Sequence, residues 1–276
     1  MQTILTVVGA RPQFIKAAAV SRAIRARSDM REVMVHTGQH FDDNMSDVFF
    51  RELDIPAPAH HLGIGGGGHG RMTGRMLEAL EQLMLDTPPD WVLVYGDTNS
   101  TIAGALAAAK LHIPVAHVEA GLRSFNRKMP EELNRILTDH VSTLLLCPTR
   151  TAVENLAREG IVEGVHHVGD VMYDATLAAR EKARDASDIL ARLGLDRGRF
   201  ILATVHRAEN TDDRDRLVAV LHHLKERARG MPVVLPMHPR TRGAVRHHGL
   251  DLDGLTIIDP VGYIDMAALL DAAHEV

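Results

Sequence analysis

Acidic side chains that could exchange a proton follow apolar segments at several points in the chain. Asp97 follows the apolar run at 91–95, Glu119 follows the run at 115–118, and Glu131 lies where a helix is expected to begin. Carboxylates gathered in one cleft push each other's pKa values apart, as general acid–base catalysis requires. Asp97 alone could cap a helix and Glu131 alone could stabilise a helix dipole, so the hypothesis rests on their convergence.

A metal site is the second use that three carboxylates could have. No paired histidines at helical spacing accompany them, so we rank metal binding below acid–base chemistry.

Cationic side chains follow the first apolar run. Arg11 lies in the turn Gly9–Gln13, and Lys16 follows about one helical turn later. Ligands of open parallel sheets bind outside the carboxyl ends of the strands, where helix N-termini favour anions. We therefore predict that Arg11 and Lys16 contact a phosphate-bearing ligand. The alternative is a solvated arginine and a lysine whose ammonium reaches water.

Histidines end two apolar runs in the second half of the chain. His206 follows the run at 200–205, with Arg207 beside it, and His238 follows the run at 233–236. The chain has 17 histidines, most of them expected to be structural, so position alone singles out His206. It would face a cleft if two domains faced each other.

The elements that must position these residues alternate along the chain. Expected strands are 4–8, 32–36, 91–95, 115–118 and 144–147. Expected helices between them are 14–27, 43–53, 71–85 and 101–111. Because the strands are continuous apolar runs, they indicate a parallel sheet buried on both faces. Repeated strand–helix units predict a doubly wound α/β domain.

A second, shorter series begins near Phe200. Its expected strands are 200–205, 233–236 and 256–258, and its expected helices are 214–229 and 266–273. We predict an N-terminal domain over 1–175, a connecting helical segment over 176–198 and a C-terminal domain over 199–276. Three strands are fewer than the five or six typical of such a sheet, so the second domain is expected to be small or incomplete.

Glycines at 63, 65 and 68 match the dinucleotide-binding pattern G-x-G-x-x-G. That pattern needs a preceding strand and a following helix, and we expect no strand before Gly63. We interpret Gly63–Gly70 as a flexible loop that could serve as a lid.

Bulk composition narrows the function classes. The chain has 276 residues and a net charge of −5, which argues against a nucleic-acid surface. Its only cysteine is Cys147, so an intrachain disulfide is excluded and a reducing compartment is expected. No run approaches the roughly 20 apolar residues of a membrane span, so we expect a cytoplasmic protein without membrane contact.

Ordered motifs resemble those of the non-hydrolysing UDP-N-acetylglucosamine 2-epimerases over essentially the whole chain. The motifs are Gly9–Pro12 with Lys16, Thr37–His40, Tyr95–Thr98, His117–Arg123, Pro130–Arg135 and His206–Asn210. Their common order makes the resemblance far more specific than any single motif.

The resemblance implies two Rossmann-like domains facing across a cleft, as in glycosyltransferases of the B type. It implies substrate contacts for Arg11, Lys16 and Arg135, and catalytic roles for Asp97, Glu119, Glu131 and His206, the last near the diphosphate. The implied reaction interconverts UDP-N-acetylglucosamine and UDP-N-acetylmannosamine by elimination and re-addition of UDP, without metal or other cofactor. A cytoplasmic homodimer that supplies cell-surface polysaccharide precursors is expected.

The resemblance also implies a second, activating UDP-N-acetylglucosamine site in many bacterial members. The matching positions here are Gln39, Glu132, Arg207 and His238. Asp42 and Ala208 replace a glutamine and an arginine of those members, so we predict weak activation or none.

Other interpretations remain open. The family continues with a Ser-Gly-Gly…Glu-Glu segment that holds uridine and phosphates; we do not find this segment, so the second domain is expected to be incomplete. A glycosyltransferase, a non-catalytic sugar-nucleotide binder and an epimerase of UDP-linked acetamido uronic acids are the alternatives. The acid trio favours an epimerase.

Overall fold

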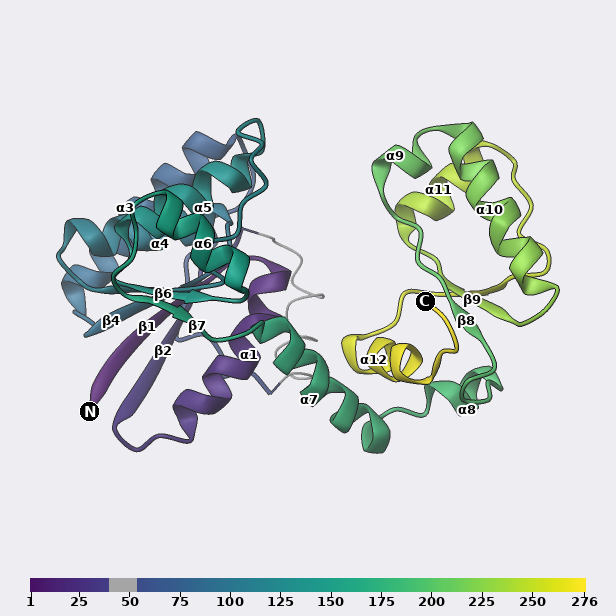
Figure 1. Cartoon of the computed structure of the whole chain (residues 1–276), viewed down its shortest axis with the longest axis horizontal. Helices are drawn as coiled ribbons and strands as arrows, with labels where there is room; N and C mark the ends of the chain where they lie inside the picture. The colour runs from purple at the N-terminus through teal and green to yellow at the C-terminus, as the bar shows by residue number, and fades with distance from the viewer. Residues whose placement is uncertain (40–53) are drawn as a thin grey trace. The chain divides into compact units, whose positions relative to one another are not determined.

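The apolar runs of the first half form neighbouring strands of one parallel sheet (Figure 1). The computed structural model describes residues 1–39 and 54–276, in two units, Met1–Ala175 and Thr176–Val276. The expected helix at 43–53 and Asp42 lie outside the described residues.

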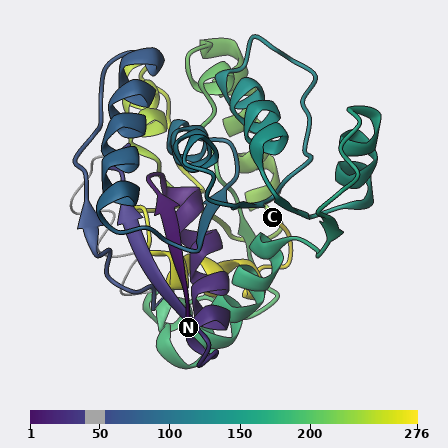
Figure 2. The ribbon, with the colours of Figure 1, turned by 90° about the vertical axis from the view of Figure 1, so that its left-hand side faces the viewer.

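The sheet of the first unit has seven described strands in the order β3-β2-β1-β4-β5-β6-β7. These are β1 (Gln2–Val8), β2 (Met30–His36), β3 (His60–His61), β4 (Trp91–Tyr95), β5 (Val115–Val118), β6 (Leu144–Cys147) and β7 (Val165–His167). Every strand pair is parallel, and β1 and β2 run side by side in both views (Figure 1, Figure 2). The expected parallel α/β class is confirmed.

Helices cover both faces of this sheet, with α1 on the side opposite α3, α4 and α5 (Figure 1). The described helices are α1 (Arg11–Arg25), α3 (His69–Asp86), α4 (Asn99–Lys110), α5 (Pro130–Val141) and α6 (Arg150–Arg158). Their presence on both faces explains why the central strands β4, β5 and β6 are mostly apolar rather than alternating.

Close packing of α4 fixes the loops at the centre of the sheet. A Cβ at Gly104 would lie 3.2 Å from Val7 of β1 and 3.3 Å from Val94 of β4. Ala103 and Ala107 of the same helix are fully buried. Small side chains therefore let α4 approach β1 and β4 closely, which limits movement where these strands end.

The second unit contains a smaller sheet in the order β10-β9-β8. Its described elements are α7 (Val171–Ala186, which begins in the first unit), α8 (Ile189–Leu193), β8 (Ile201–Leu202), α9 (Ala208–Thr211), α10 (Arg214–Ala228), β9 (Val233–Pro236), α11 (Pro239–His247), β10 (Thr256–Ile258) and α12 (Tyr263–Ala272). Val234 packs in one apolar cluster with Leu269, and Leu235 in another with Leu221. Both faces of this sheet are therefore covered as well.

Several expected elements differ from those observed. Helix α1 begins at Arg11 rather than Phe14, because Pro12 is tolerated in the first helical turn. The strand expected over 200–205 is only Ile201–Leu202.

The glycine-rich segment Gly63–Gly70 differs from its expected structure in two ways. A strand does precede Gly63, because His60 and His61 pair with Val35 and His36 of β2. Helix α3 begins at His69, so Gly70 is helical and only 62–68 form the loop.

None of the described helices is long and apolar enough to cross a membrane.

Gly121 lies where the loop after β5 packs closely against α6, so a side chain added at this position tests that packing. Its φ is +78°, and a Cβ there would lie 2.4 Å from the carbonyl oxygen of Ala152 in α6. Gly160 has a φ of +81°, but a Cβ there would meet no atom within 4 Å, so it is a matched control.

We expect Gly121→Ala to lower the unfolding free energy by roughly 1–3 kcal/mol more than Gly160→Ala, because both carry the strain of positive φ but only Gly121→Ala forces a backbone clash. Thermal unfolding followed by circular dichroism measures the difference. Equal melting temperatures for the two variants would contradict this account.

Candidate functional site

The strand order of the first sheet reverses between β1 and β4, because β2 lies beyond β1 and β5 lies beyond β4. Ligands of open α/β sheets bind at this switch point, outside the carboxyl ends of the strands. Arg11 follows β1, Asp97 follows β4 and Glu119 follows β5. The topology therefore brings these three predicted residues to one edge of the sheet.

Gln13 ties the loop after β1 to the end of β4. Its Oε1 accepts hydrogen bonds from the backbone N–H groups of Gly9 at 2.8 Å and Ala10 at 3.0 Å. Its Nε2 donates to the carbonyl of Tyr95 at 2.9 Å and to Thr101 Oγ1 at 3.0 Å. Sequence reasoning gave Gln13 no role. The signal that could have found it was a carboxamide in the first helical turn, where it can reach back to the N-cap backbone.

Lys16 and Glu119 form an ion pair between α1 and the loop after β5. Their side chains are 10% and 19% exposed, so the pair is shielded from most solvent. A Cβ at Gly96 would lie 3.2 Å from Lys16 Nζ, which places the ammonium beside the loop after β4 as well. Glu119 has a φ of +73°, an unfavourable conformation for a residue with a side chain.

Arg135 of α5 pairs with two acids. Its guanidinium contacts the carboxylate of Asp97, and its second amino group donates to Glu132 Oε2 at 2.9 Å. Asn134 adds a 3.0 Å hydrogen bond to the Asp97 carbonyl. Thr98, rather than Asp97, is the N-cap of α4, with its Oγ1 accepting from the Thr101 N–H at 3.3 Å. Capping therefore does not account for the Asp97 carboxylate.

Glu132 anchors the loop that connects Glu119 to α5. Its carboxylate is buried and accepts from Ser124 N–H and Oγ at 2.9 Å and from Phe125 N–H at 2.8 Å. Burial raises the pKa of Glu132, but these donors and Arg135 outweigh burial and lower it overall. The activator role of Glu132 stays a prediction. Glu131 beside it is exposed in the first turn of α5.

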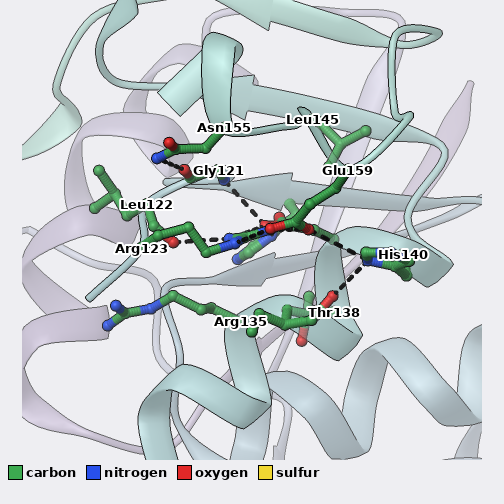
Figure 3. Close-up of polar contacts among 12 residues, drawn as sticks. Gly121, Leu122, Arg123, Arg135, Thr138, His140, Leu145, Asn155 and Glu159 are labelled. Atoms are coloured by element: carbon green, nitrogen blue, oxygen red, sulfur yellow. Dashed lines mark hydrogen bonds and ion pairs between the residues drawn. The ribbon is translucent and has the colours of Figure 1, made fainter. Parts of the chain in front are cut away.

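An ionic cluster of His117, Arg123, Asp139 and Glu159 lies next to the loop after β5. The side chains of His117, Arg123 and Asp139 are buried, whereas that of Glu159 is 28% exposed; Arg123 and Glu159 are labelled in Figure 3. Asp139 Oδ1 is 2.7 Å from His117 Nδ1, and Asp139 Oδ2 accepts from Arg123 at 2.7 Å and from Gly121 N–H at 3.1 Å. Arg123 also binds Glu159 through two nitrogens. Burial raises the pKa of Asp139, but His117 and Arg123 lower it more.

Sequence reasoning did not identify Asp139 as important. It lies two turns beyond Glu132 on α5, and a mid-helix acid ordinarily indicates a solvent-facing residue. His117 was noted only as part of a motif.

The other predicted residues are divided between the two units, with Gln39 in the first and His206, Arg207 and His238 in the second. Gln39 Oε1 accepts from Ser100 N–H at 3.0 Å and from Ser100 Oγ at 2.8 Å. His206 and His238 lie in the second unit with their ring centres 5.9 Å apart, and His238 Nδ1 accepts from Arg240 N–H. Arg207 is also in that unit and is exposed.

The arrangement in the first unit combines proton acceptors with cations. Asp97 and Glu119 each face their own positive side chain, Arg135 and Lys16 respectively. Such carboxylates can accept a proton, and the same cations can stabilise an anionic group nearby. Among the described residues, no group of three or more histidine, cysteine or acidic side chains could hold a metal ion.

Known proteins resemble the chain along nearly its whole length. The family model for UDP-N-acetylglucosamine 2-epimerase matches residues 22–276. A UDP-2,3-diacetamido-2,3-dideoxy-D-glucuronate 2-epimerase of Pseudomonas aeruginosa is 55% identical over 271 residues, covering 97% of this chain and 75% of that protein. A UDP-N-acetylglucosamine 2-epimerase of Methanocaldococcus jannaschii is 42% identical over 274 residues, covering 95% and 74%.

Solved structures agree with these sequence relationships. The Methanocaldococcus jannaschii UDP-GlcNAc 2-epimerase in complex with UDP-GlcNAc and UDP superposes with a TM-score of 0.80 at 41% identity, covering 98% of this chain and 76% of that one. The glycosyltransferase-B-like fold class expected from the motifs is confirmed by such neighbours. The chain therefore belongs to the UDP-N-acetylglucosamine 2-epimerase family and is an isomerase of the 2-epimerase type.

Proposed function

We propose that the chain inverts carbon 2 of a UDP-linked 2-acetamido sugar, with Asp97, Glu119 and Glu131 as its acid–base groups. The observation that carries the proposal is the pairing of Asp97 with Arg135 and of Glu119 with Lys16 at the switch point of the sheet. Proton acceptors and cations adjoin one another there, which is what the removal of a proton and the departure of an anion require.

The proposed reaction has two balanced steps. A carboxylate removes the proton from C2, the C2–H electrons form a C1=C2 double bond, and the C1–O bond breaks to release UDP. UDP oxygen then bonds to C1 again, while an acid group protonates C2 from the opposite face. The carboxylates exchange protons with the sugar and no net oxidation occurs.

Cations hold the diphosphate while it is detached from the sugar. In this proposal Arg11, Lys16 and Arg135 of the domain at 1–175 contact the sugar nucleotide. His206 of the domain at 199–276 contributes near the diphosphate, with 176–198 as the connecting segment. Lys16 supports this role because its ammonium lies between Glu119 and the Gly96 loop.

Two substrates fit the proposed chemistry. UDP-N-acetylglucosamine is the sugar implied by the motifs and by the relative from Methanocaldococcus jannaschii. The higher identity of the Pseudomonas aeruginosa relative, 55% against 42%, favours the diacetamido glucuronate. The uronate carries one more negative charge, and the exposed Arg127 and Lys128 between Glu119 and Glu131 offer cations for it.

We expect the kcat/KM for UDP-2,3-diacetamido-2,3-dideoxyglucuronate to exceed that for UDP-N-acetylglucosamine by at least about tenfold, since one charge-assisted contact is worth about that much. Product analysis by chromatography with both purified sugars measures the ratio. A ratio below one would make UDP-N-acetylglucosamine the substrate.

Turnover in heavy water should place deuterium at C2 of the product, because the proposed mechanism returns a proton from a carboxylate that exchanges with solvent. Mass spectrometry and proton NMR of the recovered sugar detect the label. Product that contains only protium at C2 would argue against elimination by these acids.

Asp97→Asn should lower kcat at least about 100-fold, the scale of positioned acid–base catalysis, while the fold survives. Asp29→Asn is the control, because it removes an exposed carboxylate that pairs with Arg27 outside the site. Kinetics and circular dichroism are measured on both. Near-normal turnover by folded Asp97→Asn would refute the acid–base role of Asp97.

A further inference from the structure

The cluster of His117, Arg123, Asp139 and Glu159 connects the two loops that carry Asp97 and Glu119. His117 Nε2 lies 2.7 Å from the carbonyl oxygen of Gly96, the residue before Asp97. On the other side, Asp139 Oδ2 accepts from the N–H of Gly121, two residues after Glu119. One histidine–carboxylate pair therefore spans from one acid-bearing loop to the other.

Both neighbours of the His117 ring are hydrogen-bond acceptors. A backbone carbonyl accepts only, so Nε2 must donate to Gly96. Asp139 receives hydrogen bonds from Arg123 and Gly121 on its other oxygen, which favours the ionised, accepting form, so Nδ1 must donate as well. The ring satisfies both partners only with a proton on each nitrogen.

The charges of the cluster then balance. Protonated His117 and Arg123 face ionised Asp139 and Glu159, and the His117 and Asp139 side chains are fully buried. A buried ion pair of this kind contributes little net stability compared with apolar packing, but it is strongly directional. Direction matters at this position because Glu119 has a φ of +73°, a conformation that the surrounding structure must hold in place for a residue with a side chain.

We propose that His117, as an imidazolium held by Asp139, is a positioning residue that sets the Asp97 loop and the Glu119 loop relative to each other for catalysis. The proposal rests on the acid–base roles given above. The acid–base roles of Asp97 and Glu119 then depend on the charged side chain of His117, which does not itself contact the sugar.

His117→Leu removes both donors and leaves Gly96 and Asp139 without their partner. Misplacement of reacting groups by about 1 Å can cost about 100-fold in rate, so we expect kcat to fall by about 100-fold. UDP affinity, measured by calorimetry, should stay within about twofold, because the diphosphate contacts assigned above remain. His117→Gln can still donate from its Nε2 to Gly96 but carries no charge to pair with Asp139, so it should recover about tenfold of the lost kcat and stay about tenfold below the wild-type chain.

Leu80→Ala is the control for lost stability. Leu80 is fully buried in α3 and packs in the core between that helix and the sheet. Its truncation destabilises the fold without touching either loop. We expect its kcat to stay near that of the wild-type chain. A kcat loss equal to that of His117→Leu would overturn the positioning role.

Nitrogen-15 NMR of the wild-type chain tests the protonation state independently of turnover, with the His117 signals assigned by their loss in His117→Gln. We expect a proton on both ring nitrogens. A His117 ring nitrogen without a proton would overturn the proposal, and this result can be obtained whether or not the chain is active.

The two proposals fail in different ways. A wild-type chain that converts neither UDP sugar contradicts the proposed function. An active chain whose His117→Leu variant keeps its kcat contradicts the positioning role. If His117→Leu does not fold, a His117→Gln variant with wild-type kcat would contradict that role in its place.

Discussion

Buried and half-buried charges must be paired, and this requirement organises the carboxyl edge of the first sheet. Transfer of an unpaired carboxylate out of water costs several kcal/mol, so each acid at this edge needs a cation or several N–H donors. Glu119 has Lys16, Asp97 has Arg135, and Asp139 has His117 and Arg123. The loops after β4 and β5 are shaped by these pairs, and Asp139 accepts a further hydrogen bond from the backbone N–H of Gly121.

Helix α5 is the element on which most of these pairs depend. Glu132, Arg135 and Asp139 lie on one side of it and reach the loop at 120–129, Asp97 and His117 respectively. A shift of this helix by one residue would turn those side chains by about 100° and break all of the contacts together. The site therefore depends on the register of one helix as much as on the strands that precede the acids.

The central strands were predictable because strands buried on both faces are continuous apolar runs. The runs at 91–95, 115–118 and 144–147 form strands with those bounds. The edge strands β3 and β7 were missed, because His60–His61 and Val165–His167 are short, histidine-rich and partly exposed. The place of Asp97 and Glu119 at strand ends followed from the same runs. The role of Asp139 did not, because only the three-dimensional contact with His117 distinguishes it from an ordinary helical acid.

The left-handed backbone of Glu119 has a consequence for how this chain could change over evolutionary time. Glycine adopts that conformation without steric strain, so a glutamate there is estimated to cost about 1–3 kcal/mol of the free energy of unfolding. Selection for stability alone would replace Glu119, and selection for a carboxylate beside Lys16 would retain it. Under the acid–base role proposed for Glu119, thermostability and activity oppose each other at this position, and screening for heat resistance would select chains that lack this carboxylate.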